Sequence, residues 1–202
     1  MDKAELKRRQ AIIANDWGGI FAPHEVFYIQ SIIYAADRAG AAFERYDATV
    51  AEAASAELIV ATVQEALNHA AGVSRFFWPI KETVLSKARG RKLRSAFEID
   101  DTSPLRARKL RNAFEHFDED LDKFLMGDPV GYFFPTPLVD DHELADDKLG
   151  NIFKLVDPIR GVCVLLGEKY EFESIRAEVK RVLAKARMMD EAGGRLRGAT
   201  QG

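Results

Sequence analysis

Apolar residues recur every three or four positions along most of this chain, the spacing that places them on one face of an α-helix. The repeat is clearest between Ile59 and Phe77, inside an alanine-rich stretch that predicts one long helix over 48–77. The same periodicity, bounded by glycine, proline and capping residues, predicts further helices. Their ranges are 2–14, 23–46, 80–88, 103–126 and 173–191.

Residues that start or stop helices support these boundaries. Pro79 ends or kinks the helix before it, because proline lacks the backbone N–H that continues a helix. Ser103 and Pro104 suit a helix start, with serine as the cap and proline as the first residue. The basic run 87–94, which precedes them, predicts a loop. A pair of glycines stops the last helix and leaves 193–202 as a loose tail.

A different pattern occupies the segment before the last helix. The ranges 152–156 and 161–166 are apolar and β-branched, with a short turn sequence between them, which predicts a hairpin that 169–172 extends. The range 128–150 is rich in proline, glycine and aspartate and predicts irregular structure. We therefore predict a mainly α fold, an up-and-down helical bundle with a small β-hairpin element near 152–172.

Composition limits the class of protein. Of 202 residues, 47% are hydrophobic and 30% charged, which allows a buried core, and Trp17, Trp78 and the 13 phenylalanines are expected in it. We expect one domain over 1–192. The single Cys163 excludes a disulfide framework within the chain and fits a reducing cytoplasm. The N-terminus shows no secretory signal and no apolar stretch spans a bilayer, so we expect a cytoplasmic protein with no membrane partner.

Charge is unevenly distributed along the chain. The net charge is -3, which argues against a general nucleic-acid coat. The range from Lys81 to Arg111, however, contains ten basic and four acidic residues, a net charge of +6. The range from Glu115 to Gly150 contains eleven acidic and two basic residues, a net charge of -9. This asymmetry indicates either a side that binds a polyanion or two solvated faces that neutralise each other in the fold.

The candidate chemistry lies in the predicted helix over 103–126. Arg111 is followed at once by Asn112, and His116 lies four residues beyond. Arginine binds phosphate oxygens in a forked geometry, and histidine exchanges a proton near neutral pH. Asparagine adds an amide that donates and accepts hydrogen bonds. The alternative is that His116 is an ordinary surface histidine.

The geometry of a continuous helix places these side chains on different faces. With 3.6 residues per turn, apolar residues from Leu110 to Phe124 form one stripe, and His116 and Asn112 share the opposite, outer face. Arg111 lies about 140° around the helix from His116. A site that uses both is easier to build when two copies of the chain meet, because two-fold pairing brings the arginine of one near the histidine of the other. We therefore expect a homodimer.

The sequence Arg111-Asn112-x-x-x-His116, in a helix of a predicted helical bundle, resembles the signature of the HEPN superfamily. The resemblance implies a HEPN-type bundle and a metal-independent endoribonuclease whose composite site lies at a homodimer interface. It also implies a place in a toxin–antitoxin or phage-defence system, with an antitoxin or regulatory protein as partner. In such a site Arg111 holds the scissile phosphate, His116 transfers protons and Asn112 orients the phosphate. RNA is the implied partner.

Two features depart from the family pattern. A toxin subset has tyrosine two residues after the histidine, where its antitoxin modifies it, whereas this chain has Asp118. The segment 127–172 exceeds a minimal bundle and is expected to be an insertion. Because some members have lost catalysis, a non-catalytic module that binds RNA, a nucleotide or a protein stays open, as does a helical structural protein in which Arg111 and His116 are incidental.

Positive charges near the motif are candidates for binding the RNA backbone, or else ordinary solvated side chains. They are Arg89, Arg91, Lys92, Arg94, Arg108 and Lys109. No residue spacing indicates a metal site, and the resemblance implies no cofactor. The acidic stretch 140–143, which contains His142, either binds a cation or forms a solvated turn.

Overall fold

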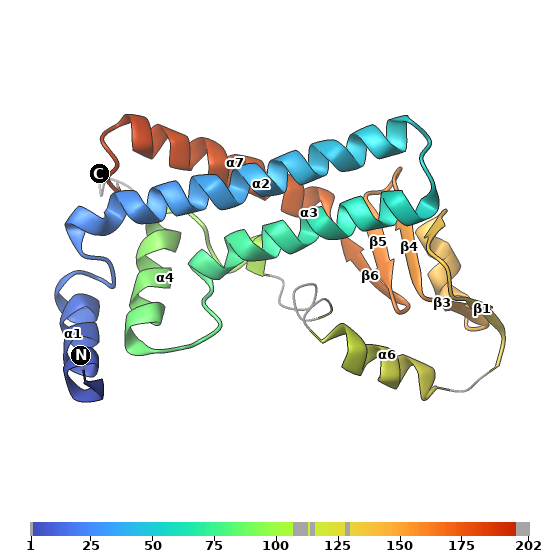
Figure 1. The fold of residues 1–202 in the computed structure, drawn as a ribbon, viewed down its shortest axis with the longest axis horizontal. Coiled ribbons are helices and arrows are strands. Elements are labelled where there is room, and N and C mark those ends of the chain that lie inside the picture. The colour runs from blue at the N-terminus through green and yellow to red at the C-terminus, as the bar shows by residue number, and fades with distance from the viewer. Residues whose placement is uncertain (1, 107–112, 114–115, 128–129, 197–202) are drawn as a thin grey trace. The chain divides into compact units, whose positions relative to one another are not determined.

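The computed structural model describes residues 2–106, 113, 116–127 and 130–196 (Figure 1). This part of the chain is mainly helical with small β-sheets, as the sequence predicts. Its α-helices are α1 (Lys3–Asp16), α2 (Glu25–Ala51), α3 (Ala56–Phe77), α4 (Val84–Phe97), α6 (Phe117–Leu125) and α7 (Glu173–Glu191). Short 3-10 helices are η1 (Ala22–His24), η2 (Pro104–Arg106) and η3 (His142–Asp146). None of the described helices combines the length and apolar character that a bilayer span requires.

The described residues group into two compact units. One comprises those of Met1–Asp37, Gly72–Arg106 and Glu178–Gly202, and the other those of Arg38–Ala71 and Ala107–Ala177. In the first unit, the buried rings of Phe77 and Phe97 meet edge to face, 5.3 Å between centroids. In the second, buried Phe172 stacks on Phe43 at 6.3 Å and meets Tyr46 edge to face at 5.5 Å. Each unit therefore has an aromatic core of its own.

The break between α2 and α3 differs from the prediction. The helix predicted over 48–77 begins only at Ala56, because α2 continues to Ala51. Ala53 adopts a left-handed conformation with φ of 49°, and the N–H of Ala54 donates to the carbonyl of Thr49. This pattern closes a helix C-terminus. Glycine usually occupies such a position, and here alanine does, so the sequence carries no recognisable stop signal.

The basic segment predicted as a loop is helical. α4 begins after Thr83, whose hydroxyl accepts the backbone N–H of Ser86, and it buries Leu93 and Phe97. Gly90, within this basic run, has a packing role: a Cβ there would lie 2.7 Å from the carbonyl oxygen of Phe77. The glycine lets the helix approach the end of α3 closely. The loop prediction is therefore wrong because the glycine serves contact between helices.

The single helix predicted over 103–126 is also wrong. Its start is the 3-10 turn η2, and the hydroxyl of Ser103 donates to the carboxylate of Glu178. His116 has φ of -119° and ψ of 31°, outside the helical range, and forms the N-cap of α6. Because the helical geometry is interrupted at His116, face assignments based on a continuous helix do not extend across this residue.

Small sheets occupy the segment between α6 and α7 (Figure 1). The predicted hairpin is confirmed: β4 (Lys154–Asp157) pairs antiparallel with β5 (Val162–Leu165), which pairs with β6 (Glu168–Glu171). β2 (Leu138–Val139) adds to β4 in parallel, and β1 (Tyr132–Phe134) pairs in parallel with β3 (Gly150–Ile152). Ile152, Leu155, Val162 and Val164 form a buried cluster on this element. The strands within 128–150 are short and largely exposed, so they carry no strong sequence signal.

Candidate functional site

His116 is exposed to solvent at the start of α6. Its side chain is 55% exposed, and its Nδ1 lies 3.8 Å from Oε1 of Glu119, one helical turn further on. Asp118, Glu119 and Asp120 occupy the first turn of α6, where negative charge is favoured by the helix dipole. The imidazole is therefore accessible to a ligand, and the carboxylate of Glu119 lies near it at a distance longer than a hydrogen bond.

The other motif residues lie outside the described part of the chain. These are Arg111 and Asn112, together with the candidate RNA-binding residues Arg108 and Lys109. Ala113, between them and His116, is described and buried. The composite arrangement of arginine, asparagine and histidine thus stays a prediction from the sequence.

Three of the four candidate cations of α4, namely Arg91, Lys92 and Arg94, differ in what they contact. Arg91 is exposed. Nζ of Lys92 lies 2.8 Å from a carboxylate oxygen of Glu25 and donates to the carbonyl of Ile20 at 3.1 Å. Arg94 donates to a carbonyl at the end of α3 at 2.6 Å, and its guanidinium lies over the ring of Trp78. Lys92 and Arg94 therefore support the first unit, and Arg91 is the one with its side chain open to solvent.

Glu25, the partner of Lys92, is a buried carboxylate at the start of α2. It also accepts hydrogen bonds from Nε of Arg195 at 2.9 Å and from the backbone N–H of Leu196 at 3.0 Å. Burial raises the pKa of Glu25, but Lys92 and the other donors outweigh burial and hold the pKa below its ordinary value of 4.5. Glu25 thus links α2, α4 and the segment after α7 within one unit.

An aromatic cavity in the same unit gave no signal as a motif in the sequence. It has a volume of about 390 Å³ and is lined by His24, Phe27, Tyr28, Ser31 and Phe76. The prediction that all tryptophans and phenylalanines are core residues is wrong here, since Phe27 is 67% and Trp17 42% exposed. Trp78, in contrast, is buried as predicted.

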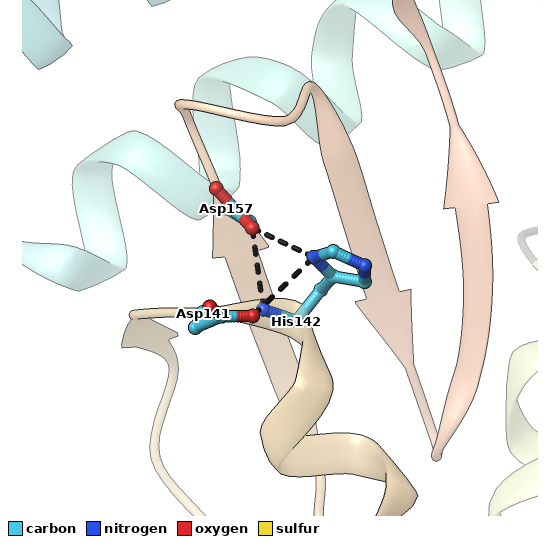
Figure 2. Close-up of side chains that lie close together, drawn as sticks. All are labelled: Asp141, His142 and Asp157. Atoms are coloured by element: carbon cyan, nitrogen blue, oxygen red, sulfur yellow. Dashed lines mark hydrogen bonds and ion pairs between the residues drawn. The ribbon is translucent and has the colours of Figure 1, made fainter.

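The second unit contains a cluster of Asp141, His142 and Asp157 (Figure 2). Nδ1 of His142 lies 2.7 Å from Oδ2 of Asp157 and 3.5 Å from Oδ1 of Asp141. Because a carboxylate only accepts hydrogen bonds, Nδ1 carries the proton and Nε2 is left as the second polar atom of the ring. Nε2 points away from both carboxylates (Figure 2). The sequence predicted a cation site or a solvated turn over 140–143, without Asp157.

Asp157 has four hydrogen bonds that explain its burial. Its Oδ1 accepts the N–H groups of Ile159 and Arg160, both at 3.0 Å, and closes the turn between β4 and β5. Its Oδ2 accepts the backbone N–H and Nδ1 of His142. Burial raises the pKa of Asp157, but these donors, the imidazole first, outweigh it and hold the pKa below 3.8.

These three residues are the ones in the described part of the chain with the spacing to hold a metal ion, their ligand atoms lying within 4.8 Å of one another. Asp141 and Asp157, but not His142, line a cavity of about 600 Å³ that Asp140 and Arg160 also line. A metal bound through Nδ1 of His142 would displace the proton that bridges to Asp157. The hydrogen bonds therefore favour a structural role, in which His142 ties η3 to the hairpin.

Replacing Asp157 by asparagine is expected to lower the free energy of unfolding at pH 7 by about 2 kcal/mol, since charged hydrogen bonds to a buried carboxylate are lost. Because its pKa is lowered in the folded protein, the contribution of Asp157 is present above the ordinary pKa of 3.8 and disappears as pH falls through the folded value. Denaturant unfolding at pH 7 and at acid pH measures both effects.

Asp140 provides the matched control, as it is exposed and accepts one hydrogen bond from its neighbour. Asp140→Asn is expected to change stability by less than about 0.5 kcal/mol. Equal effects of the two substitutions would contradict the structural role of Asp157.

Cys163 and His69 are the remaining candidate residues, and the contacts of each indicate a structural role. Cys163 is buried, and burial raises the pKa of its thiol to about 12, so the thiolate needed for nucleophilic chemistry is not formed near neutral pH. Nε2 of His69 lies 3.6 Å from Glu65, which also pairs with Arg45 at 2.6 Å. The Arg45–Glu65 pair joins α2 and α3 within the second unit, whereas the contact of His69 with Glu65 lies within α3.

The described part of the chain thus offers an exposed imidazole on α6, an aromatic cavity beside α4 and a hydrogen-bonded Asp-His pair on the sheet element. An imidazole is a group that can exchange a proton, aromatic rings can stack on a flat ligand, and the Asp-His pair stabilises a turn. Comparisons with known protein families, with curated proteins and with solved structures found no match to this chain.

Proposed function

We propose that this protein is a metal-independent endoribonuclease of HEPN type, with a composite site at a homodimer interface. The observation that carries the proposal is the exposed imidazole of His116, with the carboxylate of Glu119 beside it, five residues after Arg111 in the sequence. A buried imidazole at this position would be unable to reach a polynucleotide.

The chemistry needs few groups, because RNA carries its own nucleophile. The 2'-oxygen attacks the adjacent phosphorus, and the 5'-oxygen of the next nucleotide leaves. His116 removes the proton from the 2'-hydroxyl or returns one to the leaving oxygen, and general acid–base catalysis of this kind contributes about 10²–10⁴-fold. Arg111 stabilises the negative charge on the phosphorane, and Asn112 orients the phosphate. Glu119 keeps the imidazole in a productive orientation.

A dimer completes this scheme. One chain supplies one motif histidine, whereas the two proton transfers need a base on one side of the phosphate and an acid on the other. Two-fold pairing supplies a second imidazole and a second guanidinium. The proposal therefore includes a homodimer and, by the resemblance to HEPN proteins, an antitoxin or regulatory protein that restrains cleavage in the cytoplasm.

Incubation of the purified protein with total RNA and an excess of EDTA tests the proposal. Cleavage that persists with EDTA, leaves 2',3'-cyclic phosphate and 5'-hydroxyl ends, and fails on DNA of the same sequence is the expected result. Cleavage that chelation abolishes, or that leaves 5'-phosphate ends, would exclude this mechanism. RNA binding without cleavage would favour the non-catalytic module instead.

Growth tests the proposed toxin role separately. Expression of the protein is expected to arrest growth of a bacterial host, and expression of His116→Ala to the same level is expected to leave growth normal. Normal growth with both proteins would argue against a toxin. The nuclease proposal would then depend on the products of the RNA cleavage assay alone.

A further inference from the structure

The aromatic cavity of the first unit has the composition of a stacking site. Four of its five lining residues, His24, Phe27, Tyr28 and Phe76, present rings. Its volume of about 390 Å³ falls at the lower end of the roughly 300–1,000 Å³ typical of ligand pockets. A flat ring is the ligand shape that such walls contact over the largest area.

The rings around the cavity hold one another in place. Trp17 meets Phe21 edge to face with 4.7 Å between centroids, Phe21 meets His24 at 5.3 Å, and His24 meets Phe27 at 6.1 Å. Each ring therefore supports the next along the chain from the end of α1 to the start of α2. Stacking on rings that are already ordered avoids much of the entropy cost of binding.

Exposure of these rings indicates a surface that a ligand covers. Phe27 is 67% exposed although it belongs to a residue type that is usually buried, and Trp17 is 42% exposed. Because it is mostly exposed, Phe27 contributes little to the core of the unit. An exposed aromatic side chain of this kind can bind an unstacked base.

A positive charge adjoins the cavity. The guanidinium of Arg89 on α4 lies 6.0 Å from the ring centroid of Tyr28, one of the lining residues. Its Nε is buried and has no hydrogen-bond partner among the described residues. Arg91, on the same helix, is exposed. Rings next to arginine are the combination that binds single-stranded nucleic acid, through bases and phosphates respectively.

We propose that this cavity binds one base of single-stranded RNA, stacked against Phe27 and Tyr28, with Arg89 near a phosphate of the strand. The choice of RNA rests on the proposed function, whereas the stacking site rests on the geometry of the cavity. The site holds substrate and takes no part in the cleavage chemistry. Duplex RNA is excluded, because its bases are stacked on each other and their faces are not available.

Binding is measured by fluorescence anisotropy with a labelled eight-nucleotide 2'-O-methyl oligoadenylate, which cannot be cleaved because its 2'-oxygen is blocked. Phe27→Ala is expected to weaken binding about tenfold, the loss of one base–aromatic stack. Phe27→Trp, which keeps a ring, is expected to retain affinity. Phe27 is mostly exposed, so the fold should survive, and circular dichroism with thermal unfolding verifies this.

Tyr34 provides a matched control. It is also 67% exposed on α2, seven residues further along, and it does not line the cavity. Tyr34→Ala is expected to leave the affinity unchanged. The duplex form of the same oligonucleotide is expected to bind at least about tenfold more weakly than the single strand.

Three results would overturn the proposal: no binding of the single strand by the wild-type protein, equal binding by Phe27→Ala, or an equal loss in Tyr34→Ala. The outcome is independent of catalysis. A protein that binds the blocked strand through Phe27 and cleaves no natural RNA would retain the stacking site and lose the nuclease. If the Phe27→Ala variant cleaves RNA and binds the oligonucleotide as well as the wild-type protein does, the nuclease proposal stands and the stacking site is excluded.

Discussion

Replacing His116 with alanine is expected to lower the rate of RNA cleavage by at least about a hundredfold, the lower bound for a group that transfers a proton in the transition state. The side chain is 55% exposed, so stability should change by less than about 0.5 kcal/mol. Initial rates on a labelled RNA in EDTA, with unfolding curves for both proteins, measure the two quantities. A large loss of rate with unchanged stability identifies a chemical role.

Arg111→Ala is expected to cause a loss of similar size, since removal of one preorganised donor to a developing oxyanion costs about 10²–10³-fold. Arg111→Lys should recover little, because an ammonium lacks the forked geometry of the guanidinium. Glu119→Gln provides the graded control: it keeps the size of the side chain that approaches His116 and is expected to reduce the rate less than His116→Ala. Cleavage that persists in both alanine variants would show that the activity lies elsewhere.

A mixture of the two alanine variants tests the composite site. When the arginine of one chain acts with the histidine of the other, a mixed dimer keeps one intact arginine–histidine pair but only one of the two imidazoles. The mixture is therefore expected to regain a small part of the wild-type rate, above the rate of either variant alone. When both act within one chain, every pair in the mixture is broken and the rate stays at the background. Denaturing and refolding the two variants together ensures that mixed dimers form.

Lys92→Met is expected to lower the free energy of unfolding by about 3 kcal/mol at pH 7, because it leaves the carboxylate of Glu25 buried without its ammonium partner. Arg91→Met, one residue earlier on the same helix, should change stability by less than about 0.5 kcal/mol, since its side chain is exposed. Denaturant titration of both variants gives the comparison.

The effect of pH provides an internal check. The pKa of Glu25 is lowered in the folded protein, so the stability that its charge contributes is present above 4.5 and is lost as pH falls through the folded value. The difference between wild type and Lys92→Met should therefore shrink at acid pH. A difference that is constant with pH would mean that Lys92 acts through packing of its alkyl chain instead.

The variants Lys92→Met and Arg91→Met also separate an effect on stability from an effect on binding at neighbouring positions. Arg91→Met is expected to weaken binding of the single-stranded oligonucleotide and to do so less as salt is raised, since phosphate contacts are screened. Basic residues grouped in the sequence as one candidate patch thus divide by their surroundings. Charge alone predicted the group, whereas the contacts with Glu25 and with the carbonyl of Phe77 make Lys92 and Arg94 structural.

Elements with strong local signals were predictable. α7 occupies the predicted range, because its apolar periodicity is regular and a glycine pair follows it. The β4–β5 hairpin is also as predicted, since two short runs of apolar, β-branched residues flank a turn sequence. In both cases the residues that determine the element are neighbours in the chain.

Elements that depend on distant contacts were not predictable. The basic run 87–94 predicted a loop, whereas it forms part of α4, where the carbonyl of Phe77 leaves no room for a side chain at Gly90. His116 fitted a continuous helix, yet it ends up as the cap of α6. The pairing of His142 with Asp157 joins residues fifteen positions apart, and the acidic stretch around His142 gave no indication of which carboxylate it meets.

The sequence by itself determined the mainly helical class, the hairpin and the identity of the motif residues, because periodicity and residue type are local properties of the chain. The tertiary structure alone decided that Lys92 neutralises a buried carboxylate and that Phe27 faces solvent beside other rings, whereas the exposure of His116 was already predicted from the sequence. Burial and electrostatic partners arise from residues that folding brings together across many positions. No pattern within a short window contains that information.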